Sequence, residues 1–240
     1  MSCFLSIKGL LRTSMLDWPG RICSVVFLGG CNFRCPYCHN PELVEIEDPL
    51  DVISWKTVRG YLWERRGWID GVSVTGGEPT LHSDLKVLCR EIKELGMKVK
   101  LDTNGSRPRA LEELLEEGML DSVAMDVKTT PDKYPDLVRR EVDKNDIRKS
   151  IELIVGCGLE QEFRCTVVPG LVDFNDLKQI AGTVEGARSL VLQQFRSDIT
   201  LDPMYAGVKS FSDDTLRDWA ECLSRWVPTT VRGTVGVSQR

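Results

Sequence analysis

Three cysteines stand close together in the segment CNFRCPYCHN, residues 31–40. Cys31, Cys35 and Cys38 have the spacing C-x3-C-x2-C, which chance would rarely produce even in a chain with nine cysteines. Cysteine groups of this density are typical of zinc and iron–sulfur sites. Structural zinc needs a fourth ligand, and His39 is poorly placed to supply it because it adjoins Cys38. An iron–sulfur cube on three thiolates would instead keep one iron open for a substrate or cofactor, with structural zinc as the alternative.

The composition is that of an ordinary globular protein, with 42% hydrophobic and 28% charged residues. The net charge of -5 gives no support to nucleic-acid binding, which favours a basic surface. No apolar run reaches the length of about 18 residues typical of a membrane span, and the N-terminus lacks a complete signal peptide. We therefore expect a cytoplasmic protein with no nucleic-acid or membrane partner. In a reducing cytosol, cysteines favour metal or redox use over disulfides.

Strand-like and helix-like runs alternate six times along the chain. Parallel strands need crossover connections, so this alternation predicts an α/β fold with a parallel sheet covered by helices. The strands are expected at 23–30, 71–77, 97–105, 121–128, 160–170 and 188–195, the helices at 52–67, 83–96, 109–118, 146–158, 174–184 and 212–227, and a last short strand at 229–233.

Six units are too few for a closed eight-stranded barrel. A partial (β/α)6 open barrel is therefore the first choice, and a doubly wound open sheet is the alternative. We expect a single domain over residues 1–240, with a core of about 20–195 and a C-terminal helix and short strand within 212–233.

Glycines and polar residues gather where each expected strand ends. The segments, in chain order, are CNFRCPYCHN, GGEPT, DTNG, MDVK, VVPG and QQF. Functional sites of α/β folds are built at the carboxyl ends of the strands. The sequence therefore predicts one site at this edge of the sheet, with the cysteines as part of it.

These segments resemble the motifs of the radical S-adenosylmethionine (SAM) superfamily. The cysteine motif follows the first expected strand, with the aromatic Tyr37 before its last cysteine, and TGGEPT (75–80) follows the second. The resemblance extends over residues 10–195. Within the superfamily, DWPG (17–20), CPYCHN, DTNG, MDVK and VVPGLVD (167–173) are most similar to glycyl-radical-enzyme activases, and among these to the activating protein of anaerobic ribonucleoside-triphosphate reductase.

The resemblance implies a chemistry and a set of partners. A [4Fe–4S] cluster on the three cysteines would reductively cleave SAM, and the 5′-deoxyadenosyl radical would install a glycyl radical on a partner enzyme. The implied partner is anaerobic ribonucleotide reductase, and the implied electron donor is a flavodoxin or ferredoxin. No ferredoxin-like cysteine block separates the first two motifs, which indicates a single cluster.

The resemblance also implies how the cofactor is held. It places the Gly-Gly-Glu turn at the methionine ammonium, the segment around the last cysteine at the adenine and ribose, and the arginine of the fifth strand at the carboxylate. A monovalent cation is implied on three oxygen-bearing side chains, and Asp17 is expected near the entrance for the glycyl loop. The expected cofactor-binding residues are Tyr37, His39, Gly76, Gly77, Glu78, Asp102, Asn104, Asp126, Lys128, Arg164 and Val168, and the expected cation ligands are Asp102, Thr103 and Asp126.

Other functions stay open at this point. Pyruvate formate-lyase activases carry a histidine near the end of the sixth strand, whereas this chain has Gln193, Gln194 and Phe195 there. This difference counts against pyruvate formate-lyase as the target. The alternatives are a small-molecule radical SAM enzyme, such as a 7-carboxy-7-deazaguanine synthase-like protein, and a non-catalytic zinc or iron–sulfur scaffold.

Overall fold

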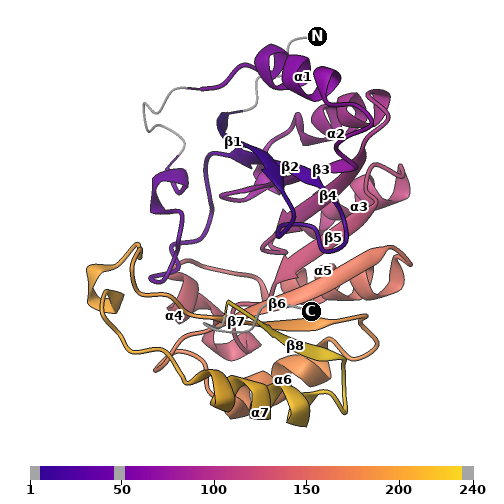
Figure 1. Cartoon of the computed structure of the whole chain (residues 1–240). Helices are drawn as coiled ribbons and strands as arrows, with labels where there is room; N and C mark the ends of the chain where they lie inside the picture. Colours follow the sequence, from indigo (N-terminus) through magenta and orange to yellow (C-terminus); the bar gives the residue numbers. More distant parts are fainter. Residues whose placement is uncertain (1–5, 46–51, 234–240) are drawn as a thin grey trace. The chain divides into compact units, whose positions relative to one another are not determined.

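A computed structural model of the protein describes residues 6–45 and 52–233. Within them, eight strands form one open sheet in the order β1 to β8 (Figure 1). β1 runs antiparallel to β2, while β2–β3, β3–β4, β6–β7 and β7–β8 pair in parallel. The prediction of an open α/β fold with a parallel sheet is therefore confirmed.

The chain divides into two compact units. The first consists of Met1–Asn32, Glu42–Thr103 and Arg107–Ala124, and the second of Phe33–Pro41, Asn104–Ser106 and Met125–Arg240. The expectation of a single functional domain stays a prediction.

The first unit holds the amino-terminal half of the sheet and its helices. α2 shows why these segments fold as they do: Leu85, Leu88, Cys89 and Ile92 recur at helical spacing and are all buried. The elements of this unit are β1 (Ile7–Ser14), β2 (Cys23–Leu28), α1 (Trp55–Glu64), β3 (Gly71–Gly76), the 3-10 turn η2 (Pro79–Leu81), α2 (Leu85–Glu94), β4 (Lys98–Thr103) and α3 (Pro108–Glu116).

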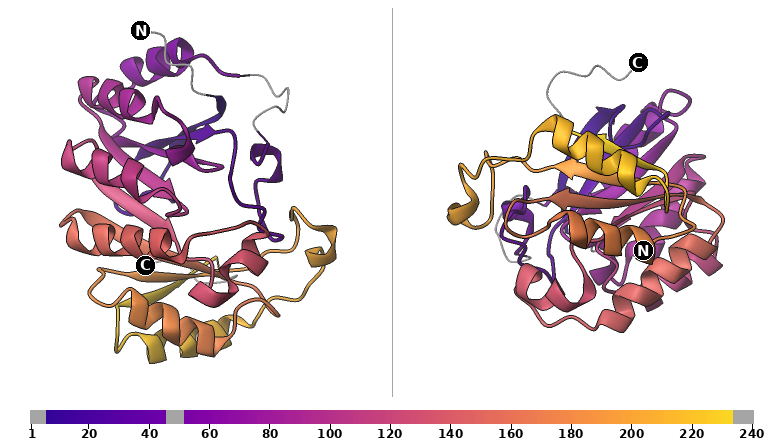
Figure 2. Two further views of the ribbon diagram at one scale, coloured as in Figure 1. Left: turned by 180° about the vertical axis from the view of Figure 1, so that it is seen from behind. Right: turned by 90° about the horizontal axis from the view of Figure 1, so that it is seen from below.

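The second unit holds the remaining strands and helices. α6 and α7 lie side by side, and the Phe174 and Trp219 rings stack at a centroid distance of 5.5 Å between them (Figures 1 and 2). α7 also runs along β8 (Figure 1). The elements are the 3-10 turns η3 (Pro131–Lys133) and η4 (Pro203–Tyr205), the helices α4 (Tyr134–Val138), α5 (Lys144–Gly156), α6 (Phe174–Thr183) and α7 (Asp213–Leu223), and the strands β6 (Glu160–Val167), β7 (Leu190–Gln194) and β8 (Thr229–Arg232).

Two elements join the units in the sequence. β5 (Ser122–Asp126) begins in the first unit and ends in the second, and the 3-10 turn η1 (Pro41–Leu43) spans the boundary near the cysteine segment.

The sequence-based prediction missed β1 and the short helix α4. Most of β1 is exposed or half-buried, so it lacks the continuous apolar run by which a buried strand is recognised. The expected helix at 52–67 begins at Trp55, after Ser54 caps it by accepting a hydrogen bond from the Thr57 amide.

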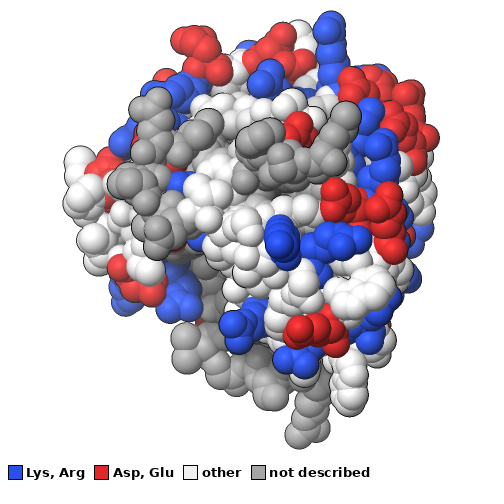
Figure 3. Space-filling view, turned by 90° about the horizontal axis from the view of Figure 1, so that it is seen from above, with Lys and Arg blue, Asp and Glu red and all other residues white. Residues whose placement is uncertain are grey.

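Two surface features bear on partners. On the described part of the face drawn in Figure 3, Lys and Arg side chains are mixed with Asp and Glu. Among the described residues, no helix is long and apolar enough to cross a lipid bilayer.

Candidate functional site

The end of β2 fixes the first cysteine. The Gly30 amide donates to the Leu43 carbonyl at 2.7 Å, and the Cys31 amide donates to the Val44 carbonyl at 3.0 Å. These two hydrogen bonds hold residues 30–31 against residues 43–44 in the first unit. The Cys31 side chain is half-buried there.

The other two cysteines lie on a tight turn in the second unit. The Cys38 amide donates to the Cys35 carbonyl at 3.0 Å, and the turn places Cys35 in a buried position and Cys38 in a half-buried one. The segment is anchored on α4, because the Arg34 amide donates to the Val138 carbonyl at 2.8 Å. The Phe33 ring also packs edge-on against Tyr134.

The chemistry of the three cysteines fits an iron–sulfur cluster. Thiolate sulfur is the ligand that such clusters require. The ammonium of Lys128 lies close enough to Cys35 and Cys38 to interact with both. Burial lowers the pKa of Lys128, but attraction first to Asp126 and then to these cysteines raises it above its usual value overall. Among the described residues, no three His, Cys, Asp or Glu side chains form a metal-binding group.

The glycines of the TGGEPT turn have a packing reason. Gly76 has φ of +128°, and a Cβ there would collide with the Leu28 backbone, while a Cβ on Gly77 would collide with the Gly30 carbonyl. The Gly77 and Glu78 amides donate to the Leu28 and Gly30 carbonyls at 2.9 and 2.8 Å. The turn is therefore fastened to the backbone just before Cys31. Contact of these glycines with the cofactor stays a prediction.

Glu78 connects the ends of β3 and β4. Its side chain is fully buried, and one carboxylate oxygen accepts hydrogen bonds from the Thr80 amide at 3.1 Å, from the Thr80 hydroxyl and from the Thr103 hydroxyl at 2.8 Å. A buried carboxylate needs such donors to offset its lost hydration. The structure thus brings together two of the expected site residues, Glu78 and Thr103.

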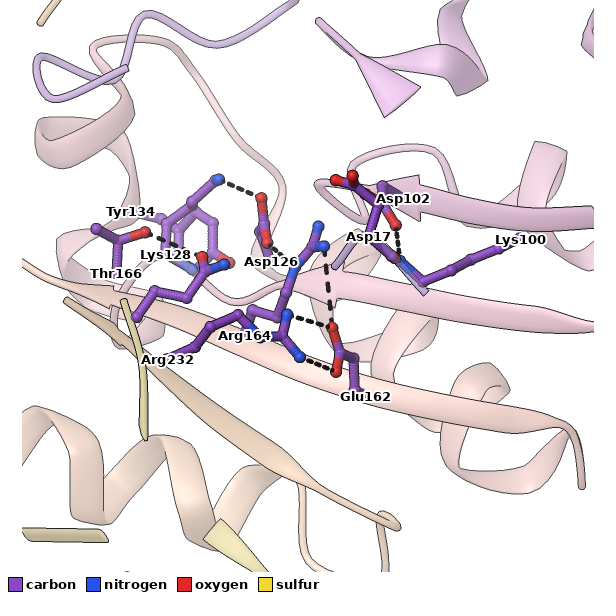
Figure 4. A network of polar contacts seen from close by, with 11 residues as sticks. Asp17, Lys100, Asp102, Asp126, Lys128, Tyr134, Glu162, Arg164, Thr166 and Arg232 are labelled. Carbon is purple, nitrogen blue, oxygen red and sulfur yellow. Dashed lines mark hydrogen bonds and ion pairs between the residues drawn. The ribbon is translucent and has the colours of Figure 1, made fainter. Parts of the chain in front are cut away.

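Asp102 has a partner that the sequence reasoning missed. The ammonium of Lys100 lies 2.6 Å from the Asp102 carboxylate and donates to the Asp17 carbonyl at 2.9 Å (Figure 4). The signal was present in the sequence, because residues two apart on a strand face the same side. The Asp17 carboxylate itself accepts from the Ser14 hydroxyl at 2.5 Å. Asn104 closes the following turn by accepting from the Ser106 amide.

In the second unit, Asp126 is held between two cations. Its carboxylate oxygens lie 2.8 Å from the Lys128 ammonium and 2.7 Å from Arg164 Nε (Figure 4). Burial raises the pKa of Asp126, but the charges of Arg164 and then Lys128 lower it well below its usual range overall. The structure therefore unites three of the expected cofactor-binding residues.

This cluster extends to two residues that the sequence reasoning did not select. Arg164 also lies 4.0 Å from Glu162, and Arg232 of β8 makes two contacts with the Glu162 carboxylate at 2.9 and 3.1 Å (Figure 4). The five side chains comprise two carboxylates and three cations. Their net positive charge suits an anionic ligand group such as a carboxylate.

Tyr37 and His39 flank the last cysteine with different surroundings. The buried Tyr37 hydroxyl has no hydrogen-bond partner among the described residues, which is unusual for a buried polar atom and leaves it available to a ligand. The His39 ring stacks on Phe195, and its Nδ1 lies 3.1 Å from the Ile199 carbonyl. Val168, at the end of β6, is fully buried. The adenine contacts expected of these residues stay predictions.

Comparisons with known proteins agree with this arrangement. The model of the radical SAM superfamily matches residues 25–184. A protein of Methanocaldococcus jannaschii named as a glycyl-radical enzyme activating enzyme is 33% identical over 95% of this chain and 96% of its own length. The pyruvate formate-lyase-activating enzyme of Clostridium pasteurianum is 28% identical over 77% of this chain and 78% of its own length.

A solved structure shares the fold. SuiB of Streptococcus suis, crystallised with bound S-adenosylmethionine, aligns with a TM-score of 0.66 and 16% identity over 85% of this chain. The chain spans about half of SuiB, 48% of its length. The extent of the family match and the identity along the whole chain show that this protein belongs to the radical SAM superfamily, whose cofactors are a [4Fe–4S] cluster and S-adenosylmethionine.

Proposed function

We propose that this protein activates a glycyl radical enzyme, and that its target is an anaerobic ribonucleoside-triphosphate reductase. The similarity to a glycyl-radical enzyme activating enzyme over 95% of this chain carries the proposal, because it includes every motif of the site. The reductase is favoured over pyruvate formate-lyase because Gln193, Gln194 and Phe195 stand where pyruvate formate-lyase activases carry a histidine.

Cys31, Cys35 and Cys38 are proposed to hold the [4Fe–4S] cluster. Bound there, the cluster supplies the low-potential electron that splits the sulfonium of SAM and so begins the radical chemistry. A flavodoxin or ferredoxin of the cytoplasm is the proposed source of this electron. The cation Lys128 lies next to Cys35 and Cys38, where it stabilises negative charge on their sulfur atoms.

The remaining residues are proposed to bind and orient the cofactor. Arg164 and Lys128 belong to the cluster with net positive charge, which supports a role in binding the cofactor carboxylate. The buried Tyr37 hydroxyl supplies a hydrogen bond to the cofactor. Glu78 keeps the Gly76–Gly77 turn in place through its bonds to Thr80 and Thr103.

Mixing the reduced, anaerobically reconstituted protein with SAM and a candidate reductase tests the proposal. We expect 5′-deoxyadenosine to form and a glycyl radical doublet to appear in electron paramagnetic resonance spectra. Replacement of Cys35 with alanine should abolish both signals. Cofactor cleavage without a glycyl radical on any reductase would contradict the activase assignment and favour a small-molecule substrate.

A further inference from the structure

Lys100 is a lysine in the interior of the first unit. Its side chain is 2% exposed, and its ammonium contacts the Asp102 carboxylate at 2.6 Å and the Asp17 carbonyl at 2.9 Å (Figure 4). A buried ammonium is very costly unless an opposite charge and hydrogen-bond acceptors compensate it. The positive charge beside Asp102 is therefore a fixed part of the protein.

The three side chains implied as ligands of a monovalent cation already have protein partners. Asp102 faces the ammonium of Lys100. Asp126 is contacted by Lys128 and Arg164 in the second unit. The Thr103 hydroxyl donates its proton to Glu78. Each of the two carboxylates that would attract a metal cation is thus contacted by a cation of the chain itself.

We infer that Lys100 takes the place of a bound monovalent cation beside Asp102. Its ammonium carries the same single charge as an alkali ion and lies in direct contact with the carboxylate. Lys100 is a positioning residue, because it acts by holding Asp102 at the end of β4. Cofactor binding by this protein should therefore be independent of Na⁺ and K⁺. This inference rests on the proposed function, which assigns Asp102 to the cofactor site.

Shortening Lys100 should convert the position into a cation site. The Asp102 carboxylate and the Asp17 carbonyl would then face the vacated space with oxygen atoms. Oxygen atoms are the ligands that hard cations prefer. A Lys100→Ala variant should accordingly acquire the dependence on Na⁺ or K⁺ that the unchanged protein lacks.

The test measures binding of S-adenosylhomocysteine, which the cluster cannot cleave reductively, by calorimetry on the reconstituted protein. Three buffers of equal ionic strength contain sodium, potassium or tetramethylammonium chloride. For the unchanged protein we expect the same Kd within about twofold in all three. A Kd that improves about tenfold or more when sodium or potassium replaces tetramethylammonium would overturn the inference. This measurement needs no variant.

Two variants sharpen the result. Lys100→Ala should bind about tenfold or more weakly in tetramethylammonium, the loss expected for one charge-assisted contact, and should recover in sodium or potassium. Lys98→Ala is the control, because it removes an exposed lysine from the same strand and should behave like the unchanged protein. A Lys100→Ala protein that binds equally well in all three salts would contradict the role of Lys100.

A failure of the proposed function would look different. In that case the unchanged protein would bind no S-adenosylhomocysteine in any salt. The thermal unfolding midpoint of the cluster-free protein then decides the question without the cofactor. It should be the same in the three salts for the unchanged protein, and should be lowered in Lys100→Ala and partly restored by sodium or potassium. A midpoint of the unchanged protein that rises with sodium or potassium would refute the inference.

Discussion

Lys128 is the residue where the site's electrostatics meet. Its ammonium contacts Asp126, its charge acts on Cys35 and Cys38, and its amide donates to the Tyr134 hydroxyl at 3.0 Å. The lysine is therefore fixed by its backbone as well as by its charge. A residue held this firmly can orient a ligand without a large loss of side-chain entropy on binding.

Replacing Lys128 with methionine should weaken cofactor binding while the cluster still assembles. Loss of one charge-assisted contact corresponds to roughly 10- to 100-fold in Kd. Calorimetry with S-adenosylhomocysteine measures the affinity, and iron and sulfide analysis measures the cluster. Lys144→Met, which removes an exposed lysine from α5, is the control. An unchanged Kd in both Lys128→Met and Asp126→Asn would remove these residues from the proposed binding site.

At the scale of elements, the junction of β3 with the segment before Cys31 is the most constrained. The register pairs Leu28 with Gly76, and the following amides continue the contact to Gly30. Backbone lies against backbone here, so no side chain can be added without displacing one of the two segments. The geometry of the first cysteine thus depends on two glycines far from it in sequence.

Gly77→Ala should therefore reduce cluster loading and lower stability. Its new Cβ would collide with the Gly30 carbonyl, so the segment carrying Cys31 must move. Gly60→Ala is the matched control, because nothing lies within 4 Å of the added Cβ in the middle of α1. That change should stabilise the protein by roughly 0.5–1 kcal/mol through helix propensity. Iron content and urea unfolding distinguish the two, and full cluster loading in Gly77→Ala would show that the junction tolerates a side chain.

The start of α6 makes a second prediction at this scale. The Asp173 carboxylate accepts hydrogen bonds from the Asn175 and Asp176 amides, and the Asp176 carboxylate accepts one from the Asp173 amide. The bond from the Asp176 amide, followed by that from Asn175, lowers the pKa of Asp173. This capping box is a sequence-local device that ends the preceding loop.

Asp173→Ala should cost about 1 kcal/mol in the free energy of unfolding. Because the folded-state pKa is lowered, the ionised cap contributes fully above the unfolded value of about 4 and its contribution is lost as the pH falls through the folded value. Urea unfolding at pH 7 and near pH 3 should show the difference from the unchanged protein shrinking at low pH. Glu185→Ala, at an exposed position, should leave unfolding unaltered at both.

The elements and the site differ in how far the sequence predicted them. Alternating runs such as CSVVFL and the glycines after them located β2 and its successors, because buried parallel strands are continuous apolar runs. The cysteine, glycine and aspartate motifs were likewise visible. Glu162, Arg232 and Lys100 were not, because their roles arise from pairings between distant strands or turns that no local pattern encodes.

At the scale of the whole molecule, the last strand supports residues from the middle of the chain. β8 pairs in parallel with β7, and its Arg232 reaches the Glu162 carboxylate on β6. Glu162 in turn lies beside Arg164, which contacts Asp126. The carboxyl-terminal element is therefore connected through side chains to the proposed cofactor-binding cluster.

Arg232→Ala should lower stability and weaken cofactor binding, because Glu162 would then compete with Asp126 for Arg164. Breaking such a partly buried pair leaves a carboxylate without its bidentate partner, a change that costs on the order of 1–3 kcal/mol. Thermal unfolding and calorimetry measure the two effects. Arg225→Ala, on an arginine that stacks on Trp226, is the control for losing a C-terminal cation. Equal cofactor affinity in the two variants would disconnect β8 from the site.

The pairing of Arg232 with Glu162 has a consequence for biosynthesis. A chain is made from its amino terminus, so the three cysteines leave the ribosome long before residue 232 of 240 is joined. During that interval Glu162 has not yet met Arg232, and the polar cluster of β5 and β6 is still incomplete. Iron and sulfide should therefore be inserted into the released polypeptide, after its final strand has docked, rather than into the nascent one.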